Sequence, residues 1–207
     1  MSSGARPSVS PLILMGAGEH ARVVAEAAAA SGWTLLGCTG NDMGKGLPML
    51  AGEPPAEAAW HAAFVGNART FAGRRARLLA MPQRTWATIV HPSAMVSPSA
   101  HVGVGTVILP GAIVHSGAVI GDHVVINSGA IVEHDVTVGD FSVLATAAAT
   151  GGGAMIGVGC YLGLGCRIRD HIAIGDGAVV GMGAVVVKSV SAGATVTGIP
   201  AREVPRG

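Results

Sequence analysis

The fold is decided by residues 107–126, which read VILPGAIVHSGAVIGDHVVI. A large aliphatic residue occupies every sixth position of this stretch, at Ile108, Val114, Ile120 and Ile126. This period matches neither the 3.6-residue turn of a helix nor the alternation of an ordinary strand. It predicts short strands joined by tight corners, with the aliphatic side chains pointing into the coil.

The same period covers residues 90–197. In steps of six from Val90 to Ala192, sixteen of the eighteen positions hold Val, Ile or Leu, and Thr150 is the polar exception. The residue four places after each is usually small, and a glycine often precedes it, where a corner needs unusual backbone angles. The register is predicted to hold without a slip over this whole stretch.

The composition excludes several classes of protein. Half of the 207 residues are hydrophobic and the formal net charge is +1, which excludes a disordered chain and gives no case for nucleic acid binding. The apolar runs are broken by Gly, His and Asp, so we expect no membrane span and no signal peptide. The three cysteines form neither a disulfide framework nor a metal pair, and we expect a cytoplasmic protein without a metal.

Residues 1–89 predict a different architecture. An apolar strand at residues 11–15 precedes the turn GAGEH at residues 16–20 and a helix over residues 21–30. Free N–H groups at such a helix start bind anions, and G-x-G-x-x-A is the looser form of the dinucleotide-binding fingerprint. Further strands are expected at residues 34–38 and 62–66, which makes a βαβ, Rossmann-like unit.

A basic run lies near the end of this N-terminal stretch. We interpret it as a solvated helix face, with general attraction for diphosphates as the alternative. Its members are Arg69, Arg74, Arg75, Arg77 and Arg84.

Three stretches together resemble the hexapeptide-repeat acyltransferases. They are the hexads of residues 90–202, GAGEHARVV at residues 16–24 and FVGNARTFAGR at residues 64–74. The resemblance is to the branch of nucleotide-sugar N-acetyltransferases of the bacillosamine and perosamine type, with the sialic acid O-acetyltransferases close by. It implies a small nucleotide-sugar-binding domain over 1–89, and a left-handed parallel β-helix with a C-terminal cap over 90–207. With three hexads a coil, six coils would stand roughly 29 Å tall.

The resemblance assigns the general base to the stretch INSGAIVEHD, residues 126–135. His134 follows the inward Val132 by two residues, so we expect it to point out of the β-helix. Imidazole titrates near neutrality, which suits it to take a proton from an amine or a hydroxyl. Asp135 matches the acidic partner of the family, and Glu133 is the competing candidate.

Gly152 lies one coil of eighteen residues after His134, so we expect the two to stack on the same face. Its N–H is well placed to donate to a thioester carbonyl, and backbone donors of this kind stabilise a developing oxyanion. Thr150 breaks the aliphatic column nearby, as expected near a functional site. No cysteine lies near the predicted base, so we expect no acyl-enzyme.

The remaining site residues are assigned to two ligands. We assign to the nucleotide sugar Gly18, Glu19, His20, Asn41, Asp42, Gly66, Asn67 and Asn127. We assign to coenzyme A Val143, Gly152, Leu164, Met182, Lys188 and Arg202. The family often has acidic residues after the second strand, where this chain reads CTGND, so the base and sugar preference stay open.

The resemblance implies a homotrimeric enzyme, and we expect it to move an acetyl group from acetyl-CoA to the amine of a nucleotide-linked amino sugar. A sugar of the 4-amino-4,6-dideoxy type is expected. A sialic-acid-type O-acetyltransferase is the first alternative, since nothing separates an amine from a hydroxyl nucleophile. A γ-class carbonic anhydrase would need three histidines on one metal, and His115, His123 and His134 do not recur at multiples of eighteen. The last alternative is a non-catalytic nucleotide-sugar-binding protein. Most of the histidines are expected at solvent-facing corners.

Overall fold

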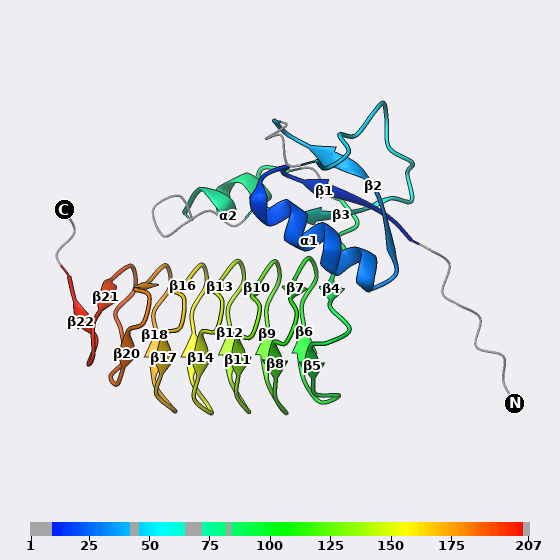
Figure 1. Ribbon diagram of the computed structural model, residues 1–207. Coiled ribbons are helices and arrows are strands. Elements are labelled where there is room, and N and C mark those ends of the chain that lie inside the picture. The colour runs from blue at the N-terminus through cyan, green and yellow to red at the C-terminus, as the bar shows by residue number, and fades with distance from the viewer. Residues whose placement is uncertain (1–9, 42–45, 65–71, 82–83, 205–207) are drawn as a thin grey trace, which may run out of the picture.

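The computed structural model describes residues 10–41, 46–64, 72–81 and 84–204. An N-terminal α/β unit rests on one side of a long parallel β-helix, and the C-terminus lies at the far end of that β-helix (Figure 1). No helix in these ranges is long and apolar enough to cross a membrane.

The β-helix has three faces, each a parallel sheet built from strands of successive coils. The first face contains β4 (Ile89–Val90), β7 (Val107–Ile108), β10 (Val125–Ile126), β13 (Val143–Leu144), β16 (Tyr161–Leu162), β19 (Val179–Val180), β21 (Thr195–Thr197) and the antiparallel β22 (Arg202–Glu203). The second face contains β5 (Met95–Val96), β8 (Ile113–Val114), β11 (Ile131–Val132), β14 (Ala149–Thr150), β17 (Arg167–Ile168) and β20 (Val185–Val186). The third face contains β6 (His101–Val102), β9 (Val119–Ile120), β12 (Thr137–Val138), β15 (Met155–Ile156) and β18 (Ala173–Ile174).

The hexad prediction is confirmed through the middle of the β-helix. The second residue of each short strand points inward, and it pairs with the residue eighteen places away, as Ile126 does with Ile108 and Leu144. These inward residues and the small residues of the corners form one continuous buried core.

The two ends of the repeat differ from the prediction. Val90 is 36% exposed, because the first coil has no neighbour before it. In the last coil Val180 pairs with Val196, sixteen residues away, so the register slips by two residues. The slip moves Val190 and Val196 into the column of large aliphatic residues, opposite Ile174 and Val180, and leaves Ala192 exposed.

The N-terminal unit contains a three-stranded parallel sheet in the order β2-β1-β3. Its elements are β1 (Ser10–Met15), α1 (Glu19–Ala30), β2 (Trp33–Thr39), β3 (Ala59–Ala62) and, after it, α2 (Ala72–Leu79). The third strand was expected at residues 62–66 and is found at residues 59–62. All four of its residues are buried, because β3 packs on both faces, and such a strand shows no alternation to read.

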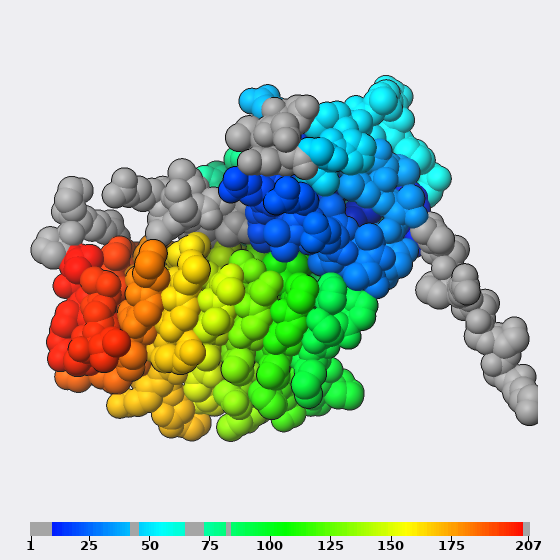
Figure 2. All heavy atoms as spheres, in the orientation of Figure 1, coloured from blue at the N-terminus to red at the C-terminus, as the bar shows by residue number. Residues whose placement is uncertain are grey.

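The two parts meet along the first face of the β-helix. The outward residues Val107, Val125 and Val143 should be solvated in an isolated coil, yet they are buried in one cluster with Leu12 and Val24. Figure 2 shows the N-terminal unit, in blue and cyan, seated directly on the green coils. The face that carries the N-terminal unit is therefore apolar on its outer side as well.

Candidate functional site

His134 lies at the corner between β11 and β12, where the second face of the β-helix meets the third. Its ring points into solvent, with 56% of the side chain exposed. Nδ1 lies 2.9 Å from Oδ2 of Asp135. The carboxylate only accepts, so Nδ1 carries the hydrogen and the lone pair of Nε2 is left as a base. This hydrogen bond raises the pKa of His134, partial desolvation opposes it, and the charges of Asp135 and Glu133 add to the rise.

Glu133 has a different set of contacts. Its Oε2 accepts from the backbone N–H of His134 at 3.3 Å, and its Oε1 lies 3.8 Å from Nε2 of His115. Of the two acidic neighbours, Asp135 is the one that holds the imidazole. A left-handed backbone at Asp135, with φ of 58°, brings its carboxylate back to the ring of the preceding residue.

Gly152 stacks beside His134, as its spacing of eighteen residues predicts. A Cβ on Gly152 would lie 2.5 Å from Nε2 of His134, so only glycine leaves room for the ring. Its N–H has no acceptor within hydrogen-bonding distance among the residues that the structure describes. The equivalent N–H of Asp122, at another corner, donates to Oδ1 of Asp140 at 2.9 Å. Gly152 thus presents an unused donor next to the imidazole.

Thr150 is buried just before this corner. Its hydroxyl lies 3.4 Å from the carbonyl oxygen of Ile131, to which it donates, and accepts from the N–H of Glu133 at 3.4 Å. The Thr150 hydroxyl therefore links the coil that contains Gly152 to β11, the strand that precedes His134.

Cys160 and Cys166 are buried in the core of the β-helix. Burial raises the pKa of Cys160 to about 11 and that of Cys166 to about 12. Both thiols are protonated at neutral pH, so neither is a thiolate nucleophile.

The N-terminal candidates gather at the carboxyl edge of the three-stranded sheet. The N–H of Gly16 donates to the carbonyl of Thr39 at 2.9 Å, which joins the loops after β1 and β2. Gly18 is the N-cap of α1, and apart from its chain neighbours no atom of the described residues lies within 4 Å of a Cβ placed there. Loops at this edge are where open parallel sheets bind ligands.

The candidates around this edge differ in exposure. Glu19 and Asn41 are exposed, whereas burial and the charge of Arg74 lower the pKa of His20 to about 4. Asp42, Gly66 and Asn67 lie outside the described residues.

One chain does not bring the two groups of candidates together. The N-terminal unit covers the first face of the β-helix, whereas His134 lies at the opposite corner, between the second and third faces. Asn127 lies at the corner between the first and second faces, where its Oδ1 accepts from the N–H of Ser128 at 2.7 Å.

Two of the coenzyme A candidates lie together. Leu164 and Met182 are 50% and 76% exposed, and both line an apolar pocket of about 240 Å³ beside Tyr161 and Gly181. The structure corrects the assignment of Val143. Its side chain is only 1% exposed because the N-terminal unit covers it, so it is not available to a ligand.

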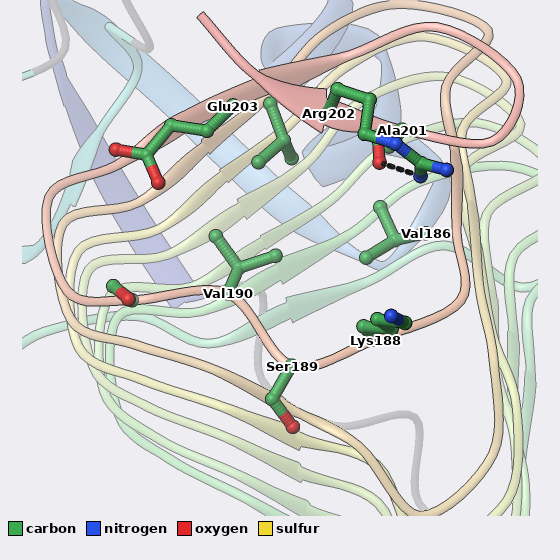
Figure 3. Close-up of a pocket in the computed structure, with 9 residues that line it drawn as sticks. Val186, Lys188, Ser189, Val190, Ala201, Arg202 and Glu203 are labelled. Atoms are coloured by element: carbon green, nitrogen blue, oxygen red, sulfur yellow. Dashed lines mark hydrogen bonds between the residues drawn. The ribbon is translucent and has the colours of Figure 1, made fainter.

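Lys188 and Arg202 line a second pocket, of about 260 Å³, at the C-terminal end of the β-helix. Figure 3 shows both side chains on the same side of this pocket, with Glu203 across from them. The Arg202 guanidinium donates to the carbonyl of Ala201 at 2.9 Å. The pocket thus has two cations on one side.

The basic run was interpreted as a solvated face, and for Arg74 this is wrong. Arg74 is 2% exposed, and its guanidinium donates to three carbonyls, those of Phe64 at 3.0 Å, His123 at 2.7 Å and Phe141 at 3.4 Å. His123 and Phe141 occupy corners of successive coils, so Arg74 joins α2 to the β-helix. The spacing of Arg74 and the buried Leu78, one helical turn apart, was the available signal.

Two histidines are exceptions to the expectation that most of them face solvent. His61 lies in β3 and is fully buried, and His123 is buried at its corner because the N-terminal unit covers it. Burial lowers the pKa of His61 to about 3, opposed by a hydrogen bond to Ala87 and assisted by the positive charges of Arg74, His20 and His123.

In the described ranges, no three His, Cys, Asp or Glu side chains are grouped so as to hold a metal ion. His123 lies at a different corner of the β-helix from His115 and His134.

Comparisons with known proteins place this geometry in a family. No family model and no curated protein matches the sequence. Among solved structures, the acetyltransferase domain of PglB from Neisseria gonorrhoeae FA1090, in complex with acetyl coenzyme A, is 31% identical with a TM-score of 0.82, covering 95% of this chain and 100% of that one. A variant of perosamine N-acetyltransferase from Caulobacter crescentus, with one histidine replaced by asparagine and in complex with CoA and GDP-perosamine, is 29% identical with a TM-score of 0.80, over 98% and 100%. WeeI from Acinetobacter baumannii AYE is 26% identical with a TM-score of 0.76, over 95% and 100%. With such identity over nearly its whole length, the chain belongs to the hexapeptide-repeat β-helix sugar N-acetyltransferases.

Proposed function

We propose that this enzyme transfers the acetyl group of acetyl-CoA to the amine of a nucleotide-linked amino sugar of the 4-amino-4,6-dideoxy type. The observation that carries the proposal is the His134–Asp135 pair with the unused N–H of Gly152 one coil further on. Similar proteins support the substrate class, since solved relatives are bound to acetyl coenzyme A and to GDP-perosamine.

The residues suggest a direct transfer. The amine nitrogen attacks the thioester carbonyl carbon while Nε2 of His134 takes a proton from it. Asp135 keeps Nδ1 protonated and stabilises the imidazolium. The N–H of Gly152 donates to the oxyanion, which collapses as the C–S bond breaks and coenzyme A leaves as a thiolate. General-base and oxyanion contributions each reach about 10²-fold or more in such reactions.

Residues 1–89 form the nucleotide-sugar-binding domain of this proposal, of Rossmann-like character. The positive end of the α1 dipole lies at this edge and favours a diphosphate, and Gly18 leaves space for it among the described residues. His20 and Asn41 border the same edge, and Glu19, Asp42, Gly66 and Asn67 complete the assignment.

A homotrimer explains why one chain keeps the two groups apart. The second face carries outward aliphatic residues, among them Met95, Ile113 and Ile131, which a neighbouring β-helix would cover. A nucleotide held on one subunit would then reach His134 of another. Acetyl-CoA would run past Leu164 and Met182 toward Lys188 and Arg202, and the cytoplasm supplies both substrates.

An acetylation assay tests the proposal. The protein is mixed with acetyl-CoA and each of a set of sugar nucleotides, 4-amino and 4-hydroxy, linked to GDP, UDP or dTDP, and free thiol is followed. We expect thiol release with a 4-amino sugar only, and a product that keeps its acetyl group in mild alkali, as an amide does. An alkali-labile product would indicate an O-acetyltransferase, and binding without thiol release would indicate a non-catalytic protein.

A further inference from the structure

The corner of the coil that follows the base consists of three glycines, Gly151 to Gly153. A Cβ on Gly152 would lie 2.5 Å from Nε2 of His134, on the coil before. A Cβ on Gly153 would lie 2.5 Å from Nδ1 of His171, on the coil after. Two imidazoles therefore occupy the space left by two consecutive glycines, and they reach it from opposite sides.

A single peptide group fixes the spacing of these two histidines. The N–H of Gly153 donates to the carbonyl of His134 at 2.9 Å, and the carbonyl of Gly152 accepts from the N–H of His171 at 3.0 Å. Both atoms belong to the peptide between Gly152 and Gly153. The backbones of His134 and His171 are thus bonded to the two sides of one planar unit.

The direction of the His171 side chain follows from its backbone. His171 has a left-handed conformation with φ of 53°, as Asp135 does with 58°. Asp135 places its carboxylate over Gly117 of the preceding coil, and His171 places its ring over Gly153 in the same way. His134 leans toward the following coil, so the two rings lie beside neighbouring glycines of the same corner.

The His171 ring is free to bind a ligand. The residue is exposed, and its ring nitrogens have no hydrogen-bond partner in the described part of the chain. A neutral imidazole always carries one N–H donor, and histidine side chains serve with backbone N–H groups in oxyanion holes. The unused N–H of Gly152 lies on the same glycine corner.

We propose that His171 is the second donor of the oxyanion hole and holds the thioester carbonyl oxygen together with the N–H of Gly152. This inference rests on the proposed acetyl transfer. His171 keeps its proton throughout, because it only donates a hydrogen bond to the oxygen as negative charge develops. The electron pair on the oxygen re-forms the C=O bond when the C–S bond breaks, and the negative charge leaves on the sulfur of coenzyme A. His134 alone exchanges a proton with the acceptor.

Two substitutions test the role without straining the backbone. His171→Gly removes the imidazole and suits the positive φ, while His171→Asn keeps an N–H donor and also tolerates this conformation. We expect His171→Gly to lower kcat by about 10²-fold, as loss of one oxyanion donor does, with KM for the sugar nucleotide little changed. We expect His171→Asn to recover at least tenfold of that loss. His101→Ala, at an exposed histidine of β6, is the matched control.

A binding measurement gives a readout that needs no acceptor sugar. Coenzyme A lacks the carbonyl, so calorimetry should show its affinity unchanged in His171→Gly while that of acetyl-CoA falls relative to it. A kcat within twofold of the unmodified protein, together with an unchanged ratio of the two affinities, would overturn the role of His171. If the protein acetylates no amino sugar, the proposed function fails, and the affinity ratio still decides whether His171 contacts the acetyl group.

Discussion

The β-helix and the N-terminal unit both have cores of aliphatic residues, but they differ in repetition. Each inward position of the β-helix recurs in every coil, whereas each buried position of the N-terminal unit occurs once. An inward position such as Val132 belongs to a column that recurs every eighteen residues, so its place is supported by every other coil. A position such as His61 in β3 occurs once, and only its partners across the sheet define it. The repeat therefore allows the inward positions of the β-helix to be predicted from the sequence. The buried positions of the N-terminal unit depend on contacts between distant residues, which the sequence pattern does not show.

The register of the β-helix can be broken by one charge, and this is the largest effect that we expect. Val132→Asp would place a carboxylate in the core, where the surrounding side chains are apolar, at a cost of several kcal/mol. The β-helix should fail to fold, measured by loss of the far-ultraviolet dichroism signal and of soluble protein. Thr137→Asp, at an exposed outward position of the next strand, should fold normally. A stable Val132→Asp protein would disprove the register.

Substitutions in the β-helix should lower the rate of acetyl transfer, whereas substitutions in the N-terminal unit should weaken binding of the sugar nucleotide. His134→Ala should lower kcat by about 10²–10⁴-fold, the usual contribution of a general base. Its melting temperature should not change, because the side chain points into solvent. A folded variant that keeps most of its activity would exclude His134 as the base, and an unfolded variant would contradict the solvent-facing position of its side chain.

The counterpart in the N-terminal unit is Gly18→Val. The fold has room for this side chain and the backbone has a negative φ, so the variant should be stable. A bound diphosphate would not have that room, so KM for the sugar nucleotide should rise by tenfold or more while KM for acetyl-CoA stays constant; tenfold corresponds to about 1.4 kcal/mol. If acetyl-CoA binding is weakened instead, the assignment of the two ligands is reversed.

The junction of the two regions depends on Arg74. Arg74→Met would leave the carbonyls of Phe64, His123 and Phe141 without their donor, and lost hydrogen bonds to a charged group cost about 1.5–3 kcal/mol. We expect the N-terminal unit to unfold at a lower denaturant concentration than the β-helix. All three tryptophans lie in the first 89 residues, so their fluorescence reports the N-terminal unit and far-ultraviolet dichroism mainly the β-helix.

Arg77→Met is the matched control, because Arg77 is an exposed arginine on the same helix. Its guanidinium lies over the Phe64 ring, 4.0 Å from the ring centroid, within the N-terminal unit. The two probes should stay close together in this variant. Coincident transitions in Arg74→Met would show that Arg74 does not join the two regions.

The site residues of the β-helix could be predicted from the sequence, whereas the residues buried by the N-terminal unit could not. His134, its neighbour Asp135 and the stacked Gly152 could be placed from sequence, because a period of eighteen residues converts sequence distance into spatial distance. The same arithmetic places His171 one coil beyond Gly153, but only the structure shows that its ring turns back over Gly153. The burial of Val143 and the contacts of Arg74 with the β-helix could not be predicted, since both depend on which face of the β-helix the N-terminal unit covers.

The smallest effect that we expect is a loss of stability of the N-terminal unit at acidic pH. Burial lowers the pKa of His20 to about 4 and that of His61 to about 3, below the ordinary value near 6.5. The unfolded chain therefore binds more protons than the folded one below pH 6.5, and stability present above that pH is lost as the pH falls. Each such histidine lowers the free energy of unfolding by up to about 1.4 kcal/mol for each pH unit between 6.5 and its pKa in the folded protein.

The groups around His61 do not offset this loss. Arg74, His20 and His123 all oppose its protonation, and the carboxylates of Asp122 and Asp140 act on His123. Between pH 6.5 and 5.5 the tryptophan transition should therefore move to lower temperature while the dichroism transition moves less. His61→Asn, which removes the titrating ring, should flatten the slope of the tryptophan transition against pH, whatever its effect on stability at pH 7. His101→Asn, at an exposed position of the third face, should leave the slope unchanged. A slope that is the same in all three proteins would mean that His61 is not the source of the acid sensitivity.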